Sequence, residues 1–365
     1  MPDSRLHRLS ALGQSVWIDF LSRELVHQGE LARMMEEDAV TGVTSNPTIF
    51  QKAISRGDAY DDQLRDLVEH EDDAKEIFIA LAGRDVGDAC DLMRAVWDGG
   101  AGLRGYVSIE VDPTLAYDSE GTLAEAKRLH ALVDKPNLYV KIPATAEGLE
   151  PIEEMIALGK SINVTLIFSL QRHREVMEAY IRGIERLVAD GGDPRPVSSV
   201  ASFFVSRVDT EADKRLAGHP ELQGKLAVAN AKLAYQSWKE VFSGERWAAL
   251  EAKGASKQWC LWASTSTKNP AYRDVLYVEE LIGPDTVNTM PEETIEAFQD
   301  HGDVALTLEQ GIDEAQRVFE AVEAAGVSVE DVTDTLEREG VQKFSDSFDE
   351  LLGGIRAKRG ELVRA

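Results

Sequence analysis

The chain has 365 residues, an ordinary hydrophobic share of 43% and a formal charge of −26, with a pI near 4.7. This length allows two domains or one large α/β barrel. The strong acidic balance repels the phosphate backbone of nucleic acids and anionic lipid surfaces, so neither is an expected partner. No segment approaches the ~20 apolar residues of a membrane span, and the N-terminus lacks the apolar core of a secretory signal. We therefore expect a soluble, cytoplasmic protein.

Short β-type runs alternate with longer helical segments along most of the chain. The expected strands are rich in β-branched and aromatic residues and span 15–20, 42–46, 106–111, 138–142, 162–168, 199–205, 258–264 and 286–290. Apolar residues at three- and four-residue spacings predict helices between them, for example at 29–39, 121–133, 169–190 and 224–242, and 48–104 also looks helical. Eight such units predict an α/β fold of the (β/α)8 TIM barrel type, with a doubly wound open sheet as the alternative.

The end of the chain differs from this alternating pattern. Residues 292–365 contain no convincing strand and predict a helical C-terminal extension. No flexible linker, low-complexity tract or short repeat divides the sequence. We therefore expect one barrel domain over 1–365, with 292–365 as its extension.

Metal and cofactor motifs are absent from the sequence. Its only cysteines, Cys90 and Cys260, are too few for a cysteine-rich metal site, and the seven histidines are scattered without an H-E-x-x-H motif. The sequence therefore predicts neither a metal nor an organic cofactor.

Polar residues cluster near the ends of the expected strands. Side chains at i and i+2 share one face of a strand. The resulting same-face pairs are Trp17/Asp19, Thr44/Asn46, Ser108/Glu110, Tyr139/Lys141, Asn163/Thr165, Ser202/Phe204 and Ser264/Ser266. In a barrel these faces point inward, whereas the opposite, apolar faces meet the helices. Charged and amide residues that point inward at strand C-termini lie where barrel enzymes build their active sites. Trp17 is expected to pack in the core rather than to contact a substrate, because its side chain is large and apolar.

Lys141 is the pivotal residue of this set. A lysine inside a barrel, flanked by Val140 and Ile142, loses hydration, which favours the neutral, nucleophilic amine. The alternative is an ion pair with Glu110 or Asp19, which would hold the amine protonated. Attack on a ketone carbonyl therefore requires these carboxylates to stand near the substrate rather than against the amine.

Several of these runs resemble one enzyme family. The segments WIDFLSR, GVTSNPTIF, SIEVDP, NLYVKIPAT, INVTLIFS and ASFFVSRVD are similar to transaldolase, a class I aldolase-type (β/α)8 enzyme of the pentose phosphate pathway. The resemblance covers most of the chain through about residue 300, in the family's order. The length and extra C-terminal helices resemble the longer bacterial subtype.

The resemblance implies roles for individual residues. It makes Lys141 the Schiff-base lysine and Asp19 the acid/base at the substrate's C4 hydroxyl. It makes Glu110 and Thr165 the pair that holds a catalytic water. The residues implied in substrate binding, most of them at the dihydroxyacetone part and the last three at the phosphate, are Thr44, Asn46, Asn163, Ser202, Phe204, Arg207, Ser266 and Lys268.

One position departs from the family pattern. Many members have a second phosphate-binding arginine after the seventh strand, whereas this chain has Lys268, with Ser266, in the run STSTKN. A lysine supplies a point charge rather than a bidentate fork.

The resemblance implies transfer of a three-carbon ketol unit between sugar phosphates, by a monomer or homodimer. Two alternatives remain open. The first is a related lysine aldolase that releases free dihydroxyacetone. The second is a non-catalytic sugar-phosphate-binding or scaffold protein, for which a buried amine would have no use.

Overall fold

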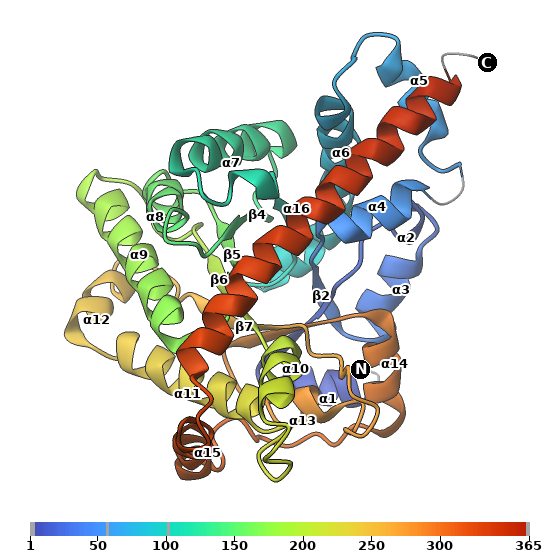
Figure 1. The fold of residues 1–365 in the computed structure, drawn as a ribbon. Helices are drawn as coiled ribbons and strands as arrows, with labels where there is room; N and C mark the ends of the chain where they lie inside the picture. Colours follow the sequence, from blue (N-terminus) through green and yellow to red (C-terminus); the bar gives the residue numbers. More distant parts are fainter. Residues whose placement is uncertain (1–3, 56–57, 101–102, 363–365) are drawn as a thin grey trace.

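The computed structural model describes residues 4–55, 58–100 and 103–362, and its centre is a closed barrel of parallel strands (Figure 1). The strands, which follow one another around the barrel in chain order, are β1 (Gln14–Ile18), β2 (Val40–Val43), β3 (Tyr106–Glu110), β4 (Leu138–Pro143), β5 (Ile162–Ile167), β6 (Ser199–Phe204), β7 (Trp259–Ala263) and β8 (Thr286–Met290). Strand β8 pairs with β1 and closes the circle. This closure confirms the predicted TIM barrel and excludes the open sheet, which would have two unpaired edges.

Helices surround the barrel and extend it at both ends of the chain (Figure 1). Those before β6 are α1 (Arg5–Ala11), α2 (Arg23–His27), α3 (Glu30–Glu37), α4 (Pro47–Ser55), α5 (Asp61–Val68), α6 (Ala74–Gly99), α7 (Ser119–Val133), α8 (Leu149–Ala157) and α9 (Leu170–Ala189), with a short 3₁₀ turn η1 (Pro113–Leu115). Those after β6 are α10 (Ser206–Arg215), α11 (Leu226–Val241), α12 (Glu245–Glu251), α13 (Leu276–Glu279), α14 (Glu292–His301), α15 (Ile312–Ala324) and α16 (Val329–Leu362). The predicted helical C-terminal extension is therefore confirmed.

Six of the eight strands end earlier than the sequence predicted, and the early ends of three of them affect where site residues lie. Strand β1 ends at Ile18, β2 at Val43 and β7 at Ala263, so several predicted same-face residues lie in the loops that follow. After β2, Asn46 accepts a hydrogen bond from Ile49 N (3.1 Å) and begins α4. After β7, Ser264 has a φ of +57°, a left-handed conformation that a strand cannot continue.

The lower interior of the barrel is filled by aromatic rings. Tyr106 and Tyr139 stack with ring centroids 3.9 Å apart, and Trp17 lies 6.0 Å from Tyr139. Gly42 allows this arrangement, because a Cβ there would lie 2.4 Å from the Trp17 ring. Trp17 is fully buried, so the expectation that it packs in the core is confirmed. These rings form the floor beneath the strand ends.

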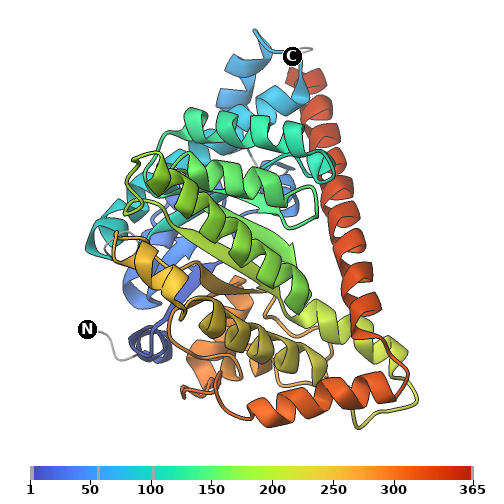
Figure 2. The same ribbon diagram turned by 90° about the vertical axis from the view of Figure 1, so that its left-hand side faces the viewer.

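Helix α16 crosses the mouth of the barrel from the α15 end to the α5 end (Figures 1 and 2). It packs against α4, α6 and α10, and Thr48 on α4 donates to Ser347 Oγ (2.8 Å). Gly340 lets the helix approach closely, because a Cβ there would lie 3.0 Å from Leu166 on β5. The end of the sequence thus covers the part of the barrel where the polar residues gather.

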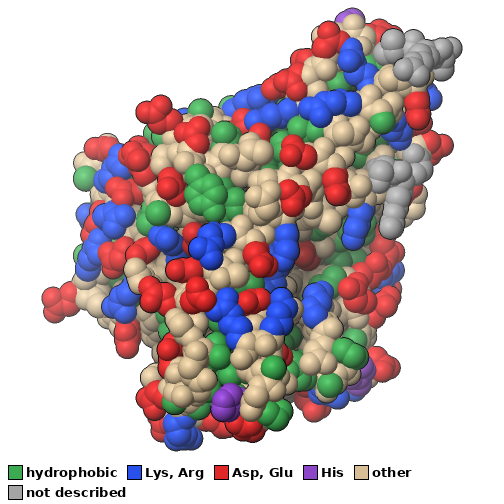
Figure 3. All heavy atoms as spheres, in the orientation of Figure 1, with side chains coloured by type: hydrophobic (Ala, Val, Ile, Leu, Met, Phe, Trp, Pro, Cys, Tyr) green, Lys and Arg blue, Asp and Glu red, His purple; other side chains and the backbone are tan. Residues whose placement is uncertain are grey.

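The surface on the α16 side carries both signs of charge. Acidic and basic side chains are interspersed over this face rather than separated into large fields, despite the net charge of −26 (Figure 3). Among the described residues, no helix is both long and apolar enough to span a membrane.

Candidate active site

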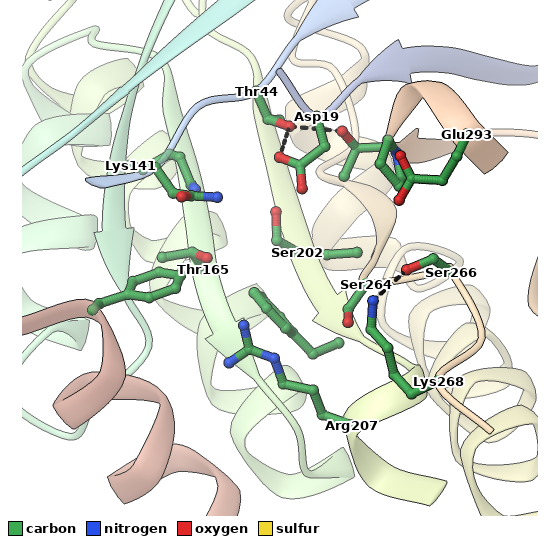
Figure 4. Close-up of a pocket in the computed structure, with 16 residues that line it drawn as sticks. Asp19, Thr44, Lys141, Thr165, Ser202, Arg207, Ser264, Ser266, Lys268 and Glu293 are labelled. Carbon is green, nitrogen blue, oxygen red and sulfur yellow. Dashed lines mark hydrogen bonds between the residues drawn. The ribbon is translucent and has the colours of Figure 1, made fainter. Parts of the chain in front are cut away.

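A cavity of about 270 Å³ opens at the C-terminal ends of the barrel strands (Figure 4). All predicted site residues except Glu110 and Asn163 line it. The complete lining is Asp19, Thr44, Asn46, Lys141, Thr165, Ser202, Phe204, Arg207, Ala263, Ser264, Ser266, Lys268, Thr289, Pro291, Glu293 and Phe344. Side chains that lie far apart in the sequence therefore meet in one small volume, because the parallel strands all end at the same face of the barrel.

The Lys141 amine lies at the inner end of this cavity. Its Nζ donates to Glu110 Oε2 (3.2 Å) and to the backbone carbonyl of Ser45 (3.0 Å). The Lys141 and Glu110 side chains are only 7% and 6% exposed. Glu110 thus does not line the cavity itself but contacts Lys141, which does.

This contact corrects one expectation from the sequence. The carboxylate of Glu110 stands against the amine, so the ion pair posed as the alternative is the observed arrangement. Burial raises the pKa of Glu110 above its ordinary value, although the Lys141 charge opposes this shift. The Glu110 carboxyl group, with its raised pKa and its oxygen 3.2 Å from the amine nitrogen, is therefore a nearby acceptor for a proton that the Lys141 amine gives up.

Asp19 lies on the opposite side of the cavity, at the end of β1. Thr44 Oγ1 donates to Asp19 Oδ1 (2.8 Å) and lies 2.7 Å from Thr289 Oγ1. Burial is the largest cause that raises the pKa of Asp19, and the charge of Lys141 and the Thr44 hydrogen bond oppose it. A carboxyl group with a raised pKa, oriented by a hydroxyl group, is a candidate to exchange protons with a substrate.

Thr165 lines the cavity on the same side as Lys141 (Figure 4). Its Oγ1 is buried and has no hydrogen-bond partner among the described residues. The register of β5 against β6 shifts between Val164 and Ile167, and Leu166 has a φ of +61°. Such a bulge next to a site re-aims the neighbouring side chain, and the unpaired hydroxyl leaves Thr165 able to hold a ligand or a water molecule.

Asn163 lies one layer below the cavity. Its amide nitrogen donates to Ser108 Oγ (3.1 Å), and its Oδ1 accepts from Ser202 Oγ (2.7 Å). Asn163 therefore orients Ser202, which does line the cavity. Its own contact with substrate stays a prediction.

The outer end of the cavity carries two cations. Arg207 rises toward the cavity from the start of α10, and its guanidinium lies 5.0 Å from the Phe204 ring (Figure 4). Its Nη1 is buried without a hydrogen-bond partner in the described structure, and burial lowers the pKa of the guanidinium. Lys268 also lines the cavity and donates to Ser266 Oγ (2.7 Å), while the phosphate-binding role of these two residues stays a prediction.

Several lining residues were missed by the sequence analysis. Thr289 lies next to the end of β8, a strand that was predicted but whose polar residues were not examined for a shared face. Ser264 was paired with Ser266 but not assigned to the site. Glu293 follows β8 at the start of α14, and its carboxylate borders the cavity near Ser266 (Figure 4). Phe344 comes from α16, and no local signal separates it from the other apolar residues of an amphipathic helix.

The described residues contain no group of three or more histidine, cysteine, aspartate or glutamate side chains placed to hold a metal ion.

The fold and the site define a class of (β/α)8 barrel proteins that carry a buried lysine at the carboxyl ends of their strands. Residues 16–355 match the sequence profile of the family described as Transaldolase/Fructose-6-phosphate aldolase. The chain belongs to this family.

Curated relatives match over nearly the full length. A protein named Transaldolase from Frankia alni is 52% identical to this chain, and the match covers 97% of each of the two proteins. A protein named Transaldolase from Acidothermus cellulolyticus is also 52% identical, and the match covers 96% of this chain and 95% of that protein. Transaldolase 2 from Streptomyces coelicolor is 50% identical over 98% of both chains. Among solved structures, a putative fructose-1,6-biphosphate aldolase from Coccidioides immitis aligns with 68% of this chain and 93% of its own, at 16% identity and a TM-score of 0.26.

Proposed function

We propose that this protein is a transaldolase. It would transfer a dihydroxyacetone unit from fructose 6-phosphate or sedoheptulose 7-phosphate to an aldose phosphate, glyceraldehyde 3-phosphate or erythrose 4-phosphate, in the pentose phosphate pathway. Membership of the family and relatives about half identical in sequence support the activity. The observation that carries the chemistry is the buried Lys141–Glu110 pair at the inner end of a cavity whose outer end holds two cations.

The reaction begins at Lys141. Glu110 accepts the ammonium proton, and the neutral amine attacks the substrate's C2 carbonyl to form a carbinolamine. A water molecule held by Glu110 and the unpaired Thr165 hydroxyl carries the protons while water is lost and the imine forms. The imine is then an electron sink for the next step.

Asp19 acts next. Its carboxylate takes the proton of the C4 hydroxyl, the C3–C4 bond breaks, and the electron pair moves into the imine to give an enamine. An aldose phosphate leaves, and the three-carbon unit stays bound to Lys141 until a second aldose phosphate accepts it. Thr44 and Thr289 orient the Asp19 carboxyl group, which fixes the direction of proton transfer.

The phosphate group lies at the outer end of the cavity in this proposal. Arg207 and Lys268 supply positive charge there, and their effect must exceed the repulsion from the net charge of −26. Screening over ~8 Å at physiological ionic strength makes local charges dominant.

An aldolase that releases free dihydroxyacetone is the second candidate, because the family also includes fructose-6-phosphate aldolases. Phe204 favours transfer. Its ring borders the cavity and gives no proton to the enamine, whereas resembling aldolases carry a tyrosine at this position. The covalent intermediate would therefore persist until an acceptor arrives.

A coupled assay tests the proposal directly. With fructose 6-phosphate and erythrose 4-phosphate, the protein should form sedoheptulose 7-phosphate, and it should release little dihydroxyacetone without acceptor. Borohydride added with fructose 6-phosphate should inactivate it and add a dihydroxyacetone-derived mass at Lys141. A label on another lysine would contradict the mechanism, and release of dihydroxyacetone independent of acceptor would favour the aldolase.

Other expectations stay proposals. We propose that the chain acts in the cytoplasm as a monomer or homodimer, as a single barrel domain, and without binding nucleic acid. Light scattering of the purified protein tests the oligomeric state, and cell fractionation tests the location.

A further inference from the structure

We propose that Phe344 of the C-terminal helix α16 is a positioning residue that, together with Phe204, clamps the guanidinium group of Arg207 for binding of the substrate's phosphate. The proposal rests on the phosphate-binding role of Arg207 in the proposed function. It assigns the C-terminal extension a direct part in the site.

The contacts around Arg207 carry the argument. The guanidinium carbon lies 5.0 Å from the centroid of the Phe204 ring and 5.9 Å from that of Phe344. Both rings are buried, at 7% and 5% exposure, and both line the cavity. Two aromatic faces within about 6 Å attract a cation and restrict its orientation.

The guanidinium has few other restraints. Its Nη1 is buried yet has no hydrogen-bond partner among the described residues. An arginine in a protein normally satisfies its donors with carboxylate or phosphate oxygens, because an unpaired buried donor is costly. Arg207 is therefore held by aromatic rings while a donor stays available for an anion in the cavity.

The two rings of the clamp come from distant parts of the sequence, so only the tertiary structure brings them together. Phe204 ends β6 and is close to Arg207 in sequence, so it is fixed by the barrel itself. Phe344 lies near Arg207 only because α16 crosses the barrel mouth. There, Gly340 packs on Leu166 of β5, and Ser347 Oγ accepts a hydrogen bond from Thr48 of α4. The Phe344 ring also lies 6.0 Å from Lys141 Nζ, so it borders the nucleophilic lysine as well as Arg207.

Phe344→Leu tests the clamp, because leucine keeps an apolar side chain but removes the aromatic face. We expect the KM for fructose 6-phosphate to rise about three- to thirty-fold, and the Kd for inorganic phosphate, measured by calorimetry, to rise in parallel. Trapping of unphosphorylated dihydroxyacetone at Lys141 by borohydride should change less than two-fold, roughly. Phe344→Tyr keeps the aromatic face and should restore phosphate binding.

Phe348→Leu is the matched control on the same helix. Phe348 is equally buried but packs edge-on against Phe78 at 5.7 Å, and it does not line the main cavity. It should lose stability without a change in phosphate affinity. If Phe344→Leu does not fold, Phe344→Met replaces it.

The outcomes separate the clamp from the proposed function. Unchanged phosphate affinity in Phe344→Leu, or an equal loss in Phe348→Leu, overturns the clamp even if the protein is a transaldolase. Failure of Phe344→Tyr to restore affinity also overturns it. Calorimetry needs no turnover, so it tests the clamp even if the protein has no transaldolase activity. If such a protein binds phosphate through Arg207 and Phe344→Leu weakens that binding, the clamp is supported and only the proposed function is contradicted.

Discussion

The two ends of the cavity are built differently. The inner half, defined here as the lining residues Asp19, Thr44, Lys141 and Thr165 together with Glu110, which is paired with Lys141, consists of residues in or directly after strands β1–β5. Most of its polar groups are hydrogen-bonded to one another or to nearby backbone. The outer half, defined as Arg207, Ser266, Lys268, Glu293 and Phe344, lies on helices and loops beyond the strands.

The difference suggests a division of labour. The proposed bond-making chemistry needs fixed geometry, which a rigid barrel supplies through strand ends. The proposed phosphate site needs charge that can attract a ligand, and Lys268 is exposed while Arg207 keeps a donor unpaired. Substitutions in the inner half should therefore lower turnover, whereas those in the outer half should raise KM.

Lys141→Ala should have the largest effect. Removal of the covalent nucleophile should lower kcat by at least ~10³-fold and abolish the borohydride label. Lys135→Ala, which removes a half-buried lysine that follows α7 and pairs with Asp91 away from the cavity, is the matched control and should keep full activity. Full activity in Lys141→Ala would contradict the proposal that the inner half carries out the bond-making steps.

Glu110→Gln should have the next largest effect. Glutamine keeps the size of the side chain but cannot accept the Lys141 proton, so imine formation should slow by roughly 10²-fold or more. Rapid-quench borohydride trapping measures that step separately from later ones. If the imine forms at the wild-type rate, Glu110 only holds the lysine in place.

Arg207→Ala probes the outer half. Loss of a charge-assisted hydrogen bond should weaken binding by about 1.5–3 kcal/mol, or roughly ten- to hundred-fold in KM for fructose 6-phosphate. Activity on unphosphorylated fructose, where detectable, should change far less. Lys214→Ala, on the same helix but exposed and paired with Glu211, is the control. Equal losses on both sugars would make Arg207 a structural residue.

Phe204→Tyr tests the boundary between the two halves. An added hydroxyl can donate to or accept from water near the enamine, so we expect a several-fold fall in transfer and a rise in free dihydroxyacetone release. Both rates are measured on one purified variant with fructose 6-phosphate, with and without acceptor. A parallel fall in the two rates would mean that Phe204 only packs the core.

Asp209→Asn should leave turnover nearly unchanged and alter stability instead. Asp209 lies on α10 beneath the outer half, where its carboxyl group accepts from Ala227 N (2.8 Å) and Tyr277 OH (2.9 Å). Burial raises its pKa to about 7. The folded protein therefore keeps a proton that the unfolded chain loses above about pH 4.

The sign of the pH effect follows from this raised pKa. The contribution of Asp209 to stability is complete below about pH 4 and is lost as the pH rises to about 7, by an amount on the order of a few kcal/mol. Denaturant unfolding at several pH values should show the wild type losing stability relative to Asp209→Asn across this window. Parallel stability curves would show that Asp209 is ionised in the folded protein.

The sequence by itself determined the barrel and most of the inner half. Strand patterns have a period of two residues and helix patterns a longer one, so both can be recognised locally. Parallel strands that end at one face then bring Asp19, Lys141 and Thr165 together without further information. Knowledge of the order of the strands was enough to expect one polar site.

Tertiary structure decided what local patterns do not encode. The contact of Glu110 with Lys141 depends on the register of β3 against β4, which pairs these residues. The early ends of β2 and β7 depend on the helix cap at Asn46 and the left-handed Ser264. Phe344 reaches Arg207 only through the path of α16 over the mouth. An apolar residue in an amphipathic helix shows which face is buried, but the partner on that face is fixed only when the chain has folded.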